Sequence, residues 1–230
     1  MFGASVGREG AALQLGGGIS SSVGRLFRLD NDQVKLLTYA SMAGLFSAVF
    51  GTPLAAFAFV LEVVYVGHIC LKAIIPSFTG SIAAYVTAML LNNHAERFHL
   101  AEVPEFHFSI LGKVLIICVL SAALSILFCK SLKWGGHVFK KHIKNDYSRI
   151  FIGGLLIIAF TLIVGTTEYN GAGINVIERI FEDNHFNHLA FALKIMLTVI
   201  AVSAGYKGGE IVPTLFVGAT FGALMGSFLG

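Results

Sequence analysis

Charged residues are scarce in this 230-residue chain, in which Asp, Glu, Lys and Arg together make up 13% of the positions. An ordinary soluble domain carries roughly a quarter. Apolar residue types reach 56%, so too few polar side chains are present to cover a water-soluble globule of this size. The composition therefore excludes a soluble globular protein and places the chain in a membrane.

Cysteine and net charge are low as well. The three cysteines lie in or beside apolar runs, which predicts buried thiols and no disulfide framework; they are Cys70, Cys118 and Cys129. The net charge of +3 is too small to indicate a nucleic-acid partner.

Several sequence signatures of enzymes and metal sites are missing too. An intramembrane enzyme that used Glu9 with a histidine or serine is an alternative, but the chain has no His-Glu-x-x-His and no paired Asp motif. His185 and His188 have no acidic or cysteine ligand set at metal spacing. We therefore expect no enzyme, no metal and no cofactor.

Long uncharged runs indicate helices that cross the membrane. They are Leu36–Leu61, Ala73–Ala95, Val114–Cys129, Ile150–Thr167 and Ile211–Gly230. A spanning helix needs about 20 mostly apolar residues, and the shorter, glycine-interrupted runs indicate half-helices that enter the bilayer and turn back. No linker or composition shift divides the chain, so we expect one all-α, polytopic helical membrane domain.

The hydrophobic pattern predicts nine helices. They are Gly10–Phe27, Val34–Phe50, Leu54–Val66, Leu71–Leu91, Ser109–Trp134, Ile150–Val164, Ile174–Phe181, Leu189–Ala204 and a last helix that includes Leu215–Gly222. Lys130–Arg149 is expected to be a loop, and because it holds six of the 16 basic residues and a single acid, the positive-inside rule places it in the cytoplasm. The glutamate-bearing loop from Asn92 to His107 is expected on the other side.

Two glycine-rich segments at opposite ends of the chain resemble one another in kind. Gly7-Arg8-Glu9-Gly10 opens one helix of small residues, and Gly208-Gly209-Glu210-Ile211-Val212-Pro213 opens another. Paired glycine-broken helix starts are typical of a binding site near the middle of a transporter. Glycine lets the backbone approach a ligand closely, and a helix start offers N–H groups and the positive end of its dipole. The pattern therefore predicts an anion site.

Carboxylates are expensive inside a membrane, so Glu9 and Glu210 require an explanation. A functional role in gating or proton transfer is one. The plain alternatives are a helix-terminal carboxylate stabilised by the dipole for Glu9, and an ion pair with Lys207 for Glu210.

The same segments resemble the CLC family of chloride channels and anion/proton antiporters. Residues 3–10 are similar to the GREGP segment of that family, and residues 208–213 to its GGxFxP segment. Gly51-Thr52-Pro53-Leu54-Ala55 followed by Glu62 is similar to its NAPLAG…IE helix, and Asn170-Gly171-Ala172-Gly173 falls at its glycine-rich loop. The resemblance implies a CLC-type fold with inverted repeats and broken or re-entrant helices.

Residues 1–230 are expected to be the central part of such a membrane domain, truncated at both ends. The first anion-binding motif of the family, GSGIP, would lie before Met1, and its pore tyrosine would lie after Gly230. A non-transporting remnant is therefore one of the alternatives.

The resemblance also implies roles for individual residues. Glu9 falls on the gating glutamate, whose carboxylate competes with the anion and carries the proton, and Glu210 is a second candidate for proton transfer. Anion binding is assigned to residues of both motifs: Gly7, Arg8, Gly10, Gly208, Gly209, Ile211, Val212 and Pro213. The family forms homodimers, and the helices at Leu54–Val66 and Leu71–Leu91 resemble its interface.

Departures from the family pattern leave the transported ion open. Ala11 replaces the proline after GREG, and Val63 stands where proton-coupled antiporters place an inner glutamate, as in channels. Glu210, in contrast, resembles the fluoride-exporting branch, which lacks that inner glutamate and still moves protons. The expected function is halide (chloride) transport gated by Glu9, with fluoride/proton antiport as the alternative. The expected partners are chloride or fluoride, protons and the lipid bilayer of a plasma or inner membrane.

Overall fold

The computed structural model describes residues 3–7, 9–64, 67–92, 108–183 and 187–229. The regular secondary structure of these residues consists of helices, apart from one isolated antiparallel bridge between Gly7 and Gly209. The predicted all-α fold is thereby confirmed.

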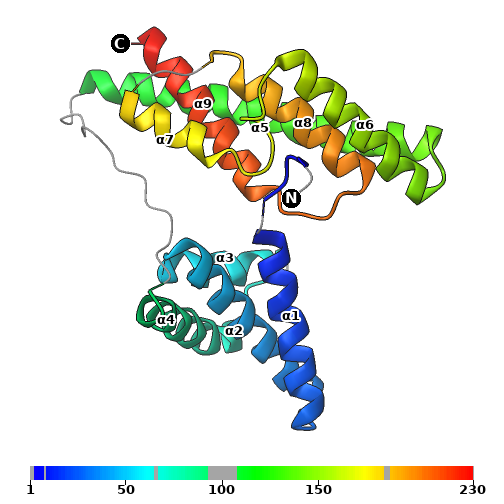
Figure 1. The fold of residues 1–230 in the computed structure, drawn as a ribbon. Coiled ribbons are helices and arrows are strands. Elements are labelled where there is room, and N and C mark those ends of the chain that lie inside the picture. Colours follow the sequence, from blue (N-terminus) through cyan, green and yellow to red (C-terminus); the bar gives the residue numbers. More distant parts are fainter. Residues whose placement is uncertain (1–2, 8, 65–66, 93–107, 184–186, 230) are drawn as a thin grey trace. The chain divides into compact units, whose positions relative to one another are not determined.

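Nine α-helices follow one another along the described residues (Figure 1). They are α1 (Glu9–Leu26), α2 (Asn31–Phe50), α3 (Pro53–Val63), α4 (Ile74–Leu90), α5 (Phe108–His142), α6 (Asp146–Val164), α7 (Ile174–Asp183), α8 (Ala190–Ala204) and α9 (Ile211–Leu229), and a single 3₁₀ turn, Leu71–Ala73, precedes α4. Among the residues that the structure describes, four stretches are long and apolar enough to cross a membrane: Leu71–Leu90, Ile110–His142, Asp146–Val164 and Ile211–Leu229. The apolar helices α3 and α8 are shorter.

Helix boundaries follow local chemistry at several places. α2 starts before the predicted Val34 because Asp30 and Gln33 form a capping box, in which each side chain accepts a hydrogen bond from the backbone of the other residue. Gly51 and Gly165 end α2 and α6 in the left-handed conformation, with φ of 67° and 73°. Glycine adopts this conformation without the steric penalty that a Cβ brings.

The expected loop at Lys130–Arg149 is wrong, because α5 continues through most of it to His142. Packing against α8 explains the extension: a Cβ on Gly135 would lie 2.5 Å from Ser203 Oγ and 2.6 Å from Val199. Tertiary contact on one face thus keeps a lysine-rich segment helical. The connection is residues 143–145, and the Asn145 side chain caps the start of α6.

The expectation of buried thiols is also wrong for two cysteines. Cys118 and Cys129 are exposed on α5, and Cys70 is half-buried. Both exposed thiols lie on a helix of which little is covered by the rest of the chain.

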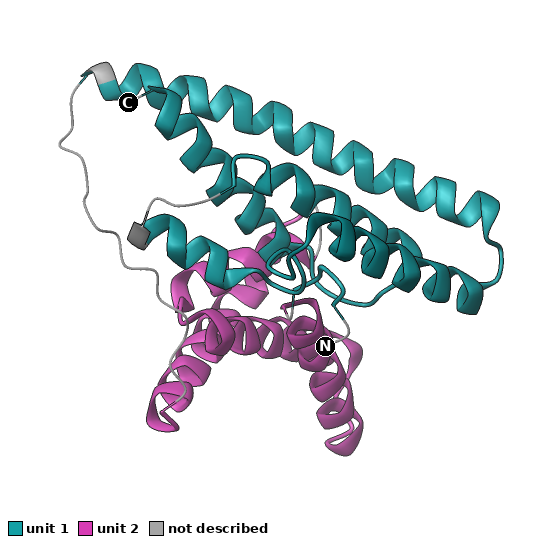
Figure 2. Cartoon of the chain, turned by 45° about the horizontal axis from the view of Figure 1, so that its top comes forward, with its two compact units in different colours: residues 1–8, 98–230 teal, residues 9–97 magenta. Residues whose placement is uncertain are grey.

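The helices form two compact groups, which Figure 2 colours separately: unit 1, residues 1–8 and 98–230, and unit 2, residues 9–97. The interpretation of the chain as one domain stays a prediction.

Unit 2 is built around α2. Tyr39 and Ala43 of this helix are fully buried in a core that includes Val60 and Ala73. α4 crosses α2 so closely that a Cβ on Gly80 would lie 2.6 Å from the Ala40 carbonyl oxygen. Small residues at such a crossing are typical of helix pairs in membranes.

Unit 1 is built around α8. Leu197 and Ala201 are buried in a core with Phe216 of α9 and Ile177 of α7. α6 packs against the end of the same helix, where a Cβ on Gly153 would lie 2.2 Å from the Cβ of Ala204. The central position of α8 allows it to support the segments described next.

Candidate functional site

In unit 1, one glycine of the first glycine-rich motif pairs with one glycine of the second. The Gly7 N–H donates to the Gly209 carbonyl oxygen over 2.7 Å, and the Gly209 N–H donates to the Gly7 oxygen over 2.9 Å. Both glycines are buried. A Cβ on Gly208 would come within 2.4 Å of Val6 Cβ, so the close approach of the two backbone segments requires glycine there. The structure therefore brings Gly7 of the first motif beside Gly209 of the second.

The bridge fixes the start of α9, two residues further along the chain. The Glu210 carbonyl oxygen accepts hydrogen bonds from the Thr214 N–H and hydroxyl, at 3.0 and 2.7 Å. Pro213 is buried and has no N–H, whereas the N–H groups of Ile211 and Val212 have no carbonyl four residues earlier within the helix. The helix start is thus built as a donor site for a negative group. The Glu210 side chain is exposed beside it.

Glu9 is the first residue of α1, in unit 2, and its side chain is only 2% exposed. A helix start favours a negative charge, while burial makes that charge costly unless other groups compensate it. Gly10 follows as a half-buried residue of the same helix, and Arg8 lies outside the described residues. The gating role of Glu9 stays a prediction.

A buried hydroxyl pair supports the segment before the first motif. Ser5 and Thr198 are both buried, and their hydroxyl oxygens lie 3.0 Å apart. The neighbouring Ala4 carbonyl oxygen accepts from the Gly171 N–H at 3.2 Å. Residues 3–7 are therefore tied to α8 and to the α6–α7 loop (residues 165–173) as well as to Gly209.

Lys194 of α8 ties the same loop from inside. This lysine is 0% exposed, and its Nζ donates to the carbonyl oxygens of Tyr169 and Gly171 at 3.0 and 2.7 Å. Nζ also lies 4.8 Å from the centroid of the Phe216 ring. Carbonyl dipoles and a ring face compensate part of the cost of a buried ammonium group.

Gly173 makes room for this arrangement. Its φ is 75°, and a Cβ there would lie 2.8 Å from the Phe216 ring and 3.2 Å from Lys194 Nζ. Our sequence interpretation included this glycine-rich loop but missed Lys194. A single lysine in the otherwise uncharged stretch Leu189–Ala204 was the available signal, because intramembrane charges usually have a specific partner.

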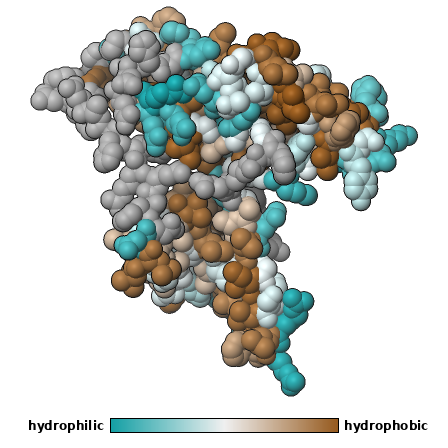
Figure 3. Space-filling view, viewed as in Figure 1, coloured by the Kyte–Doolittle hydropathy of each residue, from teal (hydrophilic) through white to brown (hydrophobic). Residues whose placement is uncertain are grey.

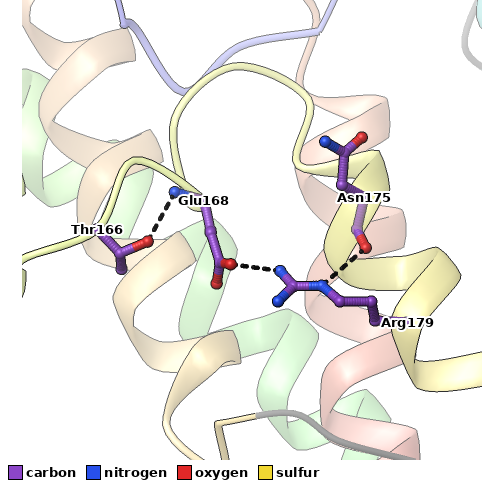
Figure 4. A network of polar contacts seen from close by, with 4 residues as sticks. All are labelled: Thr166, Glu168, Asn175 and Arg179. Carbon is purple, nitrogen blue, oxygen red and sulfur yellow. Dashed lines mark hydrogen bonds and ion pairs between the residues drawn. The ribbon is translucent and has the colours of Figure 1, made fainter. Parts of the chain in front are cut away.

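The outer side of the loop is tied to α7 (Figure 4). Glu168 forms an ion pair with Arg179, whose Nε donates to the Asn175 carbonyl oxygen at 3.3 Å. The Glu168 N–H donates to Thr166 Oγ1 at 3.2 Å. An exposed ion pair of this kind contributes little free energy, and here it joins the loop to α7.

The structure also bears on the enzyme alternative. Gly3-Ala4-Ser5-Val6-Gly7 matches the Gly-x-Ser-x-Gly pattern of serine hydrolases, in which the serine is exposed on a strand-to-helix turn. Here Ser5 is buried against Thr198, whose hydroxyl donates to the Lys194 carbonyl oxygen at 2.8 Å. Ser5 therefore has a structural role. No group of three metal-ligating side chains occurs among the residues that the structure covers.

Comparison with known proteins identifies the family. A family model described as voltage gated chloride channel matches residues 1–230. The chain belongs to this family. Its members named below are channels and transporters, so the chain is part of a multi-pass integral membrane protein, and bacterial relatives are consistent with an inner membrane.

Two curated relatives illustrate the range of the family. A "Chloride/fluoride channel protein" of Pseudomonas syringae pv. tomato is 30% identical over 235 residues, which cover 100% of this chain and 52% of the relative. An "H(+)/Cl(-) exchange transporter ClcA" of Vibrio cholerae is 27% identical over 231 residues, covering 96% of this chain and 49% of the relative. The chain thus spans about half the length of the curated relatives it matches.

Solved structures confirm the CLC-type fold. A CLC-type fluoride/proton antiporter is 29% identical, with a TM-score of 0.92 over 99% of this chain and 57% of the other. A slow cyanobacterial Cl⁻/H⁺ antiporter, 18% identical, has a TM-score of 0.82 over 99% of this chain and 54% of the other. At that identity the second match concerns the fold alone.

Proposed function

We propose that the protein carrying this chain is a proton-coupled halide transporter that exports fluoride. The observation on which this rests is the Gly7–Gly209 bridge, which holds two glycine-rich motifs together at the start of α9. Membership of the voltage gated chloride channel family supports anion transport in general. The choice of ion and the coupling to protons are our own inference.

The start of α9 supplies the anion-binding groups in this proposal. The N–H groups of Ile211 and Val212 point along the helix axis at its positive end, where hydrogen bonds and the helix dipole both favour an anion. Gly208 and Gly209 carry no side chain that would keep an ion from the backbone. Donors fixed by the bridge need no rearrangement on binding, and this favours affinity for a small ion.

Glu9 and Glu210 are the proposed proton carriers. In this proposal Glu9, which is buried, carries the proton and competes with the anion, as the gating glutamate of the family does. Glu210 is exposed and directly precedes the anion-binding N–H groups, which suits exchange of protons with water. Arg8, Gly7 and Gly10 would shape the segment that presents Glu9.

Fluoride is favoured over chloride by three observations. Glu210 occupies a position where most family members carry an apolar residue, and it resembles the fluoride-exporting branch. The 29% identical structure is a fluoride/proton antiporter, and the name of the 30% identical relative includes fluoride beside chloride. Val63, at the exposed end of α3, cannot carry a proton, which disfavours the ordinary chloride/proton exchanger. Chloride transport is the second candidate, supported by the exchange transporters at 27% identity.

We further propose that the protein forms homodimers through α3 and α4. Large apolar side chains remain exposed on these helices, among them Leu54, Ile75 and Ile82. Chemical cross-linking in membranes tests this: a dimer band that is lost on replacing these side chains by glutamate supports the interface, and its persistence contradicts it.

A liposome assay tests the transport proposal. Liposomes that contain the protein are loaded with fluoride or with chloride, and anion efflux is followed together with internal pH. Fluoride efflux with proton uptake and little chloride flux is the expected result. Chloride flux without proton movement would indicate a channel and overturn the proposal, and flux of neither anion would favour the non-transporting remnant.

A further inference from the structure

α5 is longer than a membrane requires. Its 35 residues rise about 52 Å at 1.5 Å per residue, whereas the hydrocarbon core of a bilayer is about 30 Å thick. The uncharged stretch Val114–Cys129 takes up about 24 Å of that length. The remaining helix, from Lys130 onward, is therefore expected at the level of the lipid headgroups and beyond.

This end of α5 has two different faces. Phe128 and Gly135 are buried, and they pack with Leu132 on the side that faces α8 and α9. The opposite side is an exposed basic face, whose members follow the helical spacing i, i+3, i+4, i+7 and i+11: Lys130, Lys133, Trp134, His137 and Lys141. Figure 3 shows hydrophilic atoms gathered at the end of unit 1 where α5 leads into α6, next to hydrophobic helix surface.

The positive charge of the basic face is not neutralised by nearby acids. Asp146 is the single acid between Lys130 and Arg149, and it pairs with Arg149 at 2.7 Å. Within the described part of the chain, no ion pair involves Lys130, Lys133 or Lys141. These ammonium groups are thus available to an external anion.

Trp134 indicates the depth of this face. Its side chain is 70% exposed and lies four residues after the first lysine. Tryptophan prefers the boundary between hydrocarbon and headgroups, and long lysine side chains extend their charge from that boundary toward water. An indole at the boundary with lysines on both sides matches a ligand that has an acyl tail and a negative headgroup.

We propose that the basic face of α5 binds the phosphate-bearing headgroups of acidic phospholipids in the surrounding leaflet. Charge complementarity and continuity with the membrane-crossing part of the same helix support this ligand over a soluble partner. The expected cytoplasmic location of this end agrees, because basic clusters next to a membrane span are attracted to acidic lipids on that side. The proposal does not depend on the transport function.

Trp134 also provides the test, because it is the single tryptophan of the chain. The 230-residue chain is placed in phosphatidylcholine nanodiscs that contain a fixed fraction of either brominated phosphatidylglycerol or brominated phosphatidylcholine. Bromine quenches only nearby fluorophores, so the ratio of quenching by the two lipids measures the preference for acidic lipid at the basic face. We expect stronger quenching by the acidic lipid. Each lysine should raise the affinity of the basic face for that lipid by a factor of roughly five.

Matched variants separate local from overall charge. Replacing Lys130, Lys133 and Lys141 together by glutamine should bring the quenching ratio close to one, and replacing them by arginine should preserve it. A control set changes three exposed basic residues of unit 2 to glutamine, for the same change in net charge, and should leave the ratio unchanged: Arg25, Arg28 and Lys72.

Two further measurements keep the test decisive. Circular dichroism tests whether the glutamine variant folds. If the variant does not fold, the test is the effect of salt, which must lower the preference of the unmodified chain for acidic lipid. Inorganic phosphate at equal ionic strength should compete no better than chloride, because it has no acyl chain. Equal quenching by the two lipids, a preference that survives the glutamine substitutions, or specific displacement by inorganic phosphate overturns the proposal.

Discussion

Replacing Gly208 by alanine should damage the candidate site. The new Cβ would lie 2.4 Å from Val6 Cβ, about 1 Å closer than an ordinary carbon–carbon contact of about 3.5 Å. Overpacking of this kind costs about 1–3 kcal/mol. The backbone segments around Gly7 and Gly209 must separate. This breaks the 2.7 and 2.9 Å hydrogen bonds between the two glycines and releases the start of α9.

The effect on anion binding follows from the loss of one oriented N–H group. A hydrogen bond to a charged partner contributes about 1.5–3 kcal/mol, so anion affinity should fall about tenfold or more. The assay is fluoride efflux from liposomes over a range of fluoride concentrations, together with the thermal unfolding midpoint in detergent.

Two controls make this prediction specific. Gly218 lies in α9 itself, and a Cβ there meets nothing within 4 Å, so Gly218→Ala should be neutral in both assays. Val6→Gly removes the atom that Gly208→Ala would strike, so the double variant should recover anion affinity. Equal behaviour of Gly208→Ala and Gly218→Ala would refute the reasoning.

Three further predictions concern stability. Lys194→Met should leave two loop carbonyl groups without their donor and destabilise the protein by about 2 kcal/mol or more, measured by unfolding in detergent, and an unchanged midpoint would contradict the role of the buried lysine. Gly80→Ala should cost about 1–3 kcal/mol, because its Cβ would lie 2.6 Å from the Ala40 oxygen; the readout is loss of protease resistance, and unchanged resistance would argue against the close crossing. Asp30→Ala should remove the α2 cap at a cost of about 1 kcal/mol, and Asp30→Asn, which can still cap, should cost less.

The fold was predictable from the sequence where the signal is local. Uncharged runs, glycine breaks and Pro53 mark most helix ends, because a membrane requires continuous apolar helices. The extension of α5 to His142 was not predictable from the sequence. The many lysines of residues 130–144 are typical of a solvent-exposed loop, whereas contact of Gly135 with α8 keeps most of this segment helical. Exposure of Cys118 and Cys129 was not predictable for a different reason: apolar neighbours in the sequence do not distinguish a buried core position from an apolar surface position.

The glycine-rich motifs of the candidate site were predictable from the sequence, but the side-chain contacts that hold these motifs in place were not. Two glycine-rich helix starts are typical of a transporter binding site, so both motifs could be assigned to an anion site, whereas the bridge between Gly7 and Gly209 is known from the structure alone. The contacts of Ser5 with Thr198 and of Lys194 with the α6–α7 loop join residues that are distant in sequence. Nothing in the local pattern around these residues specifies their partners.

Proton coupling through Glu9 is the central claim of this account, and its direct test compares the unmodified protein with Glu9→Gln. Both are reconstituted in fluoride-loaded liposomes, and anion efflux and internal pH are recorded together. Glutamine keeps the shape of the side chain and cannot exchange a proton, so we expect fluoride efflux with proton uptake in the unmodified protein and no coupled proton uptake in the variant. Unchanged proton coupling in Glu9→Gln would contradict the account and remove Glu9 from the mechanism.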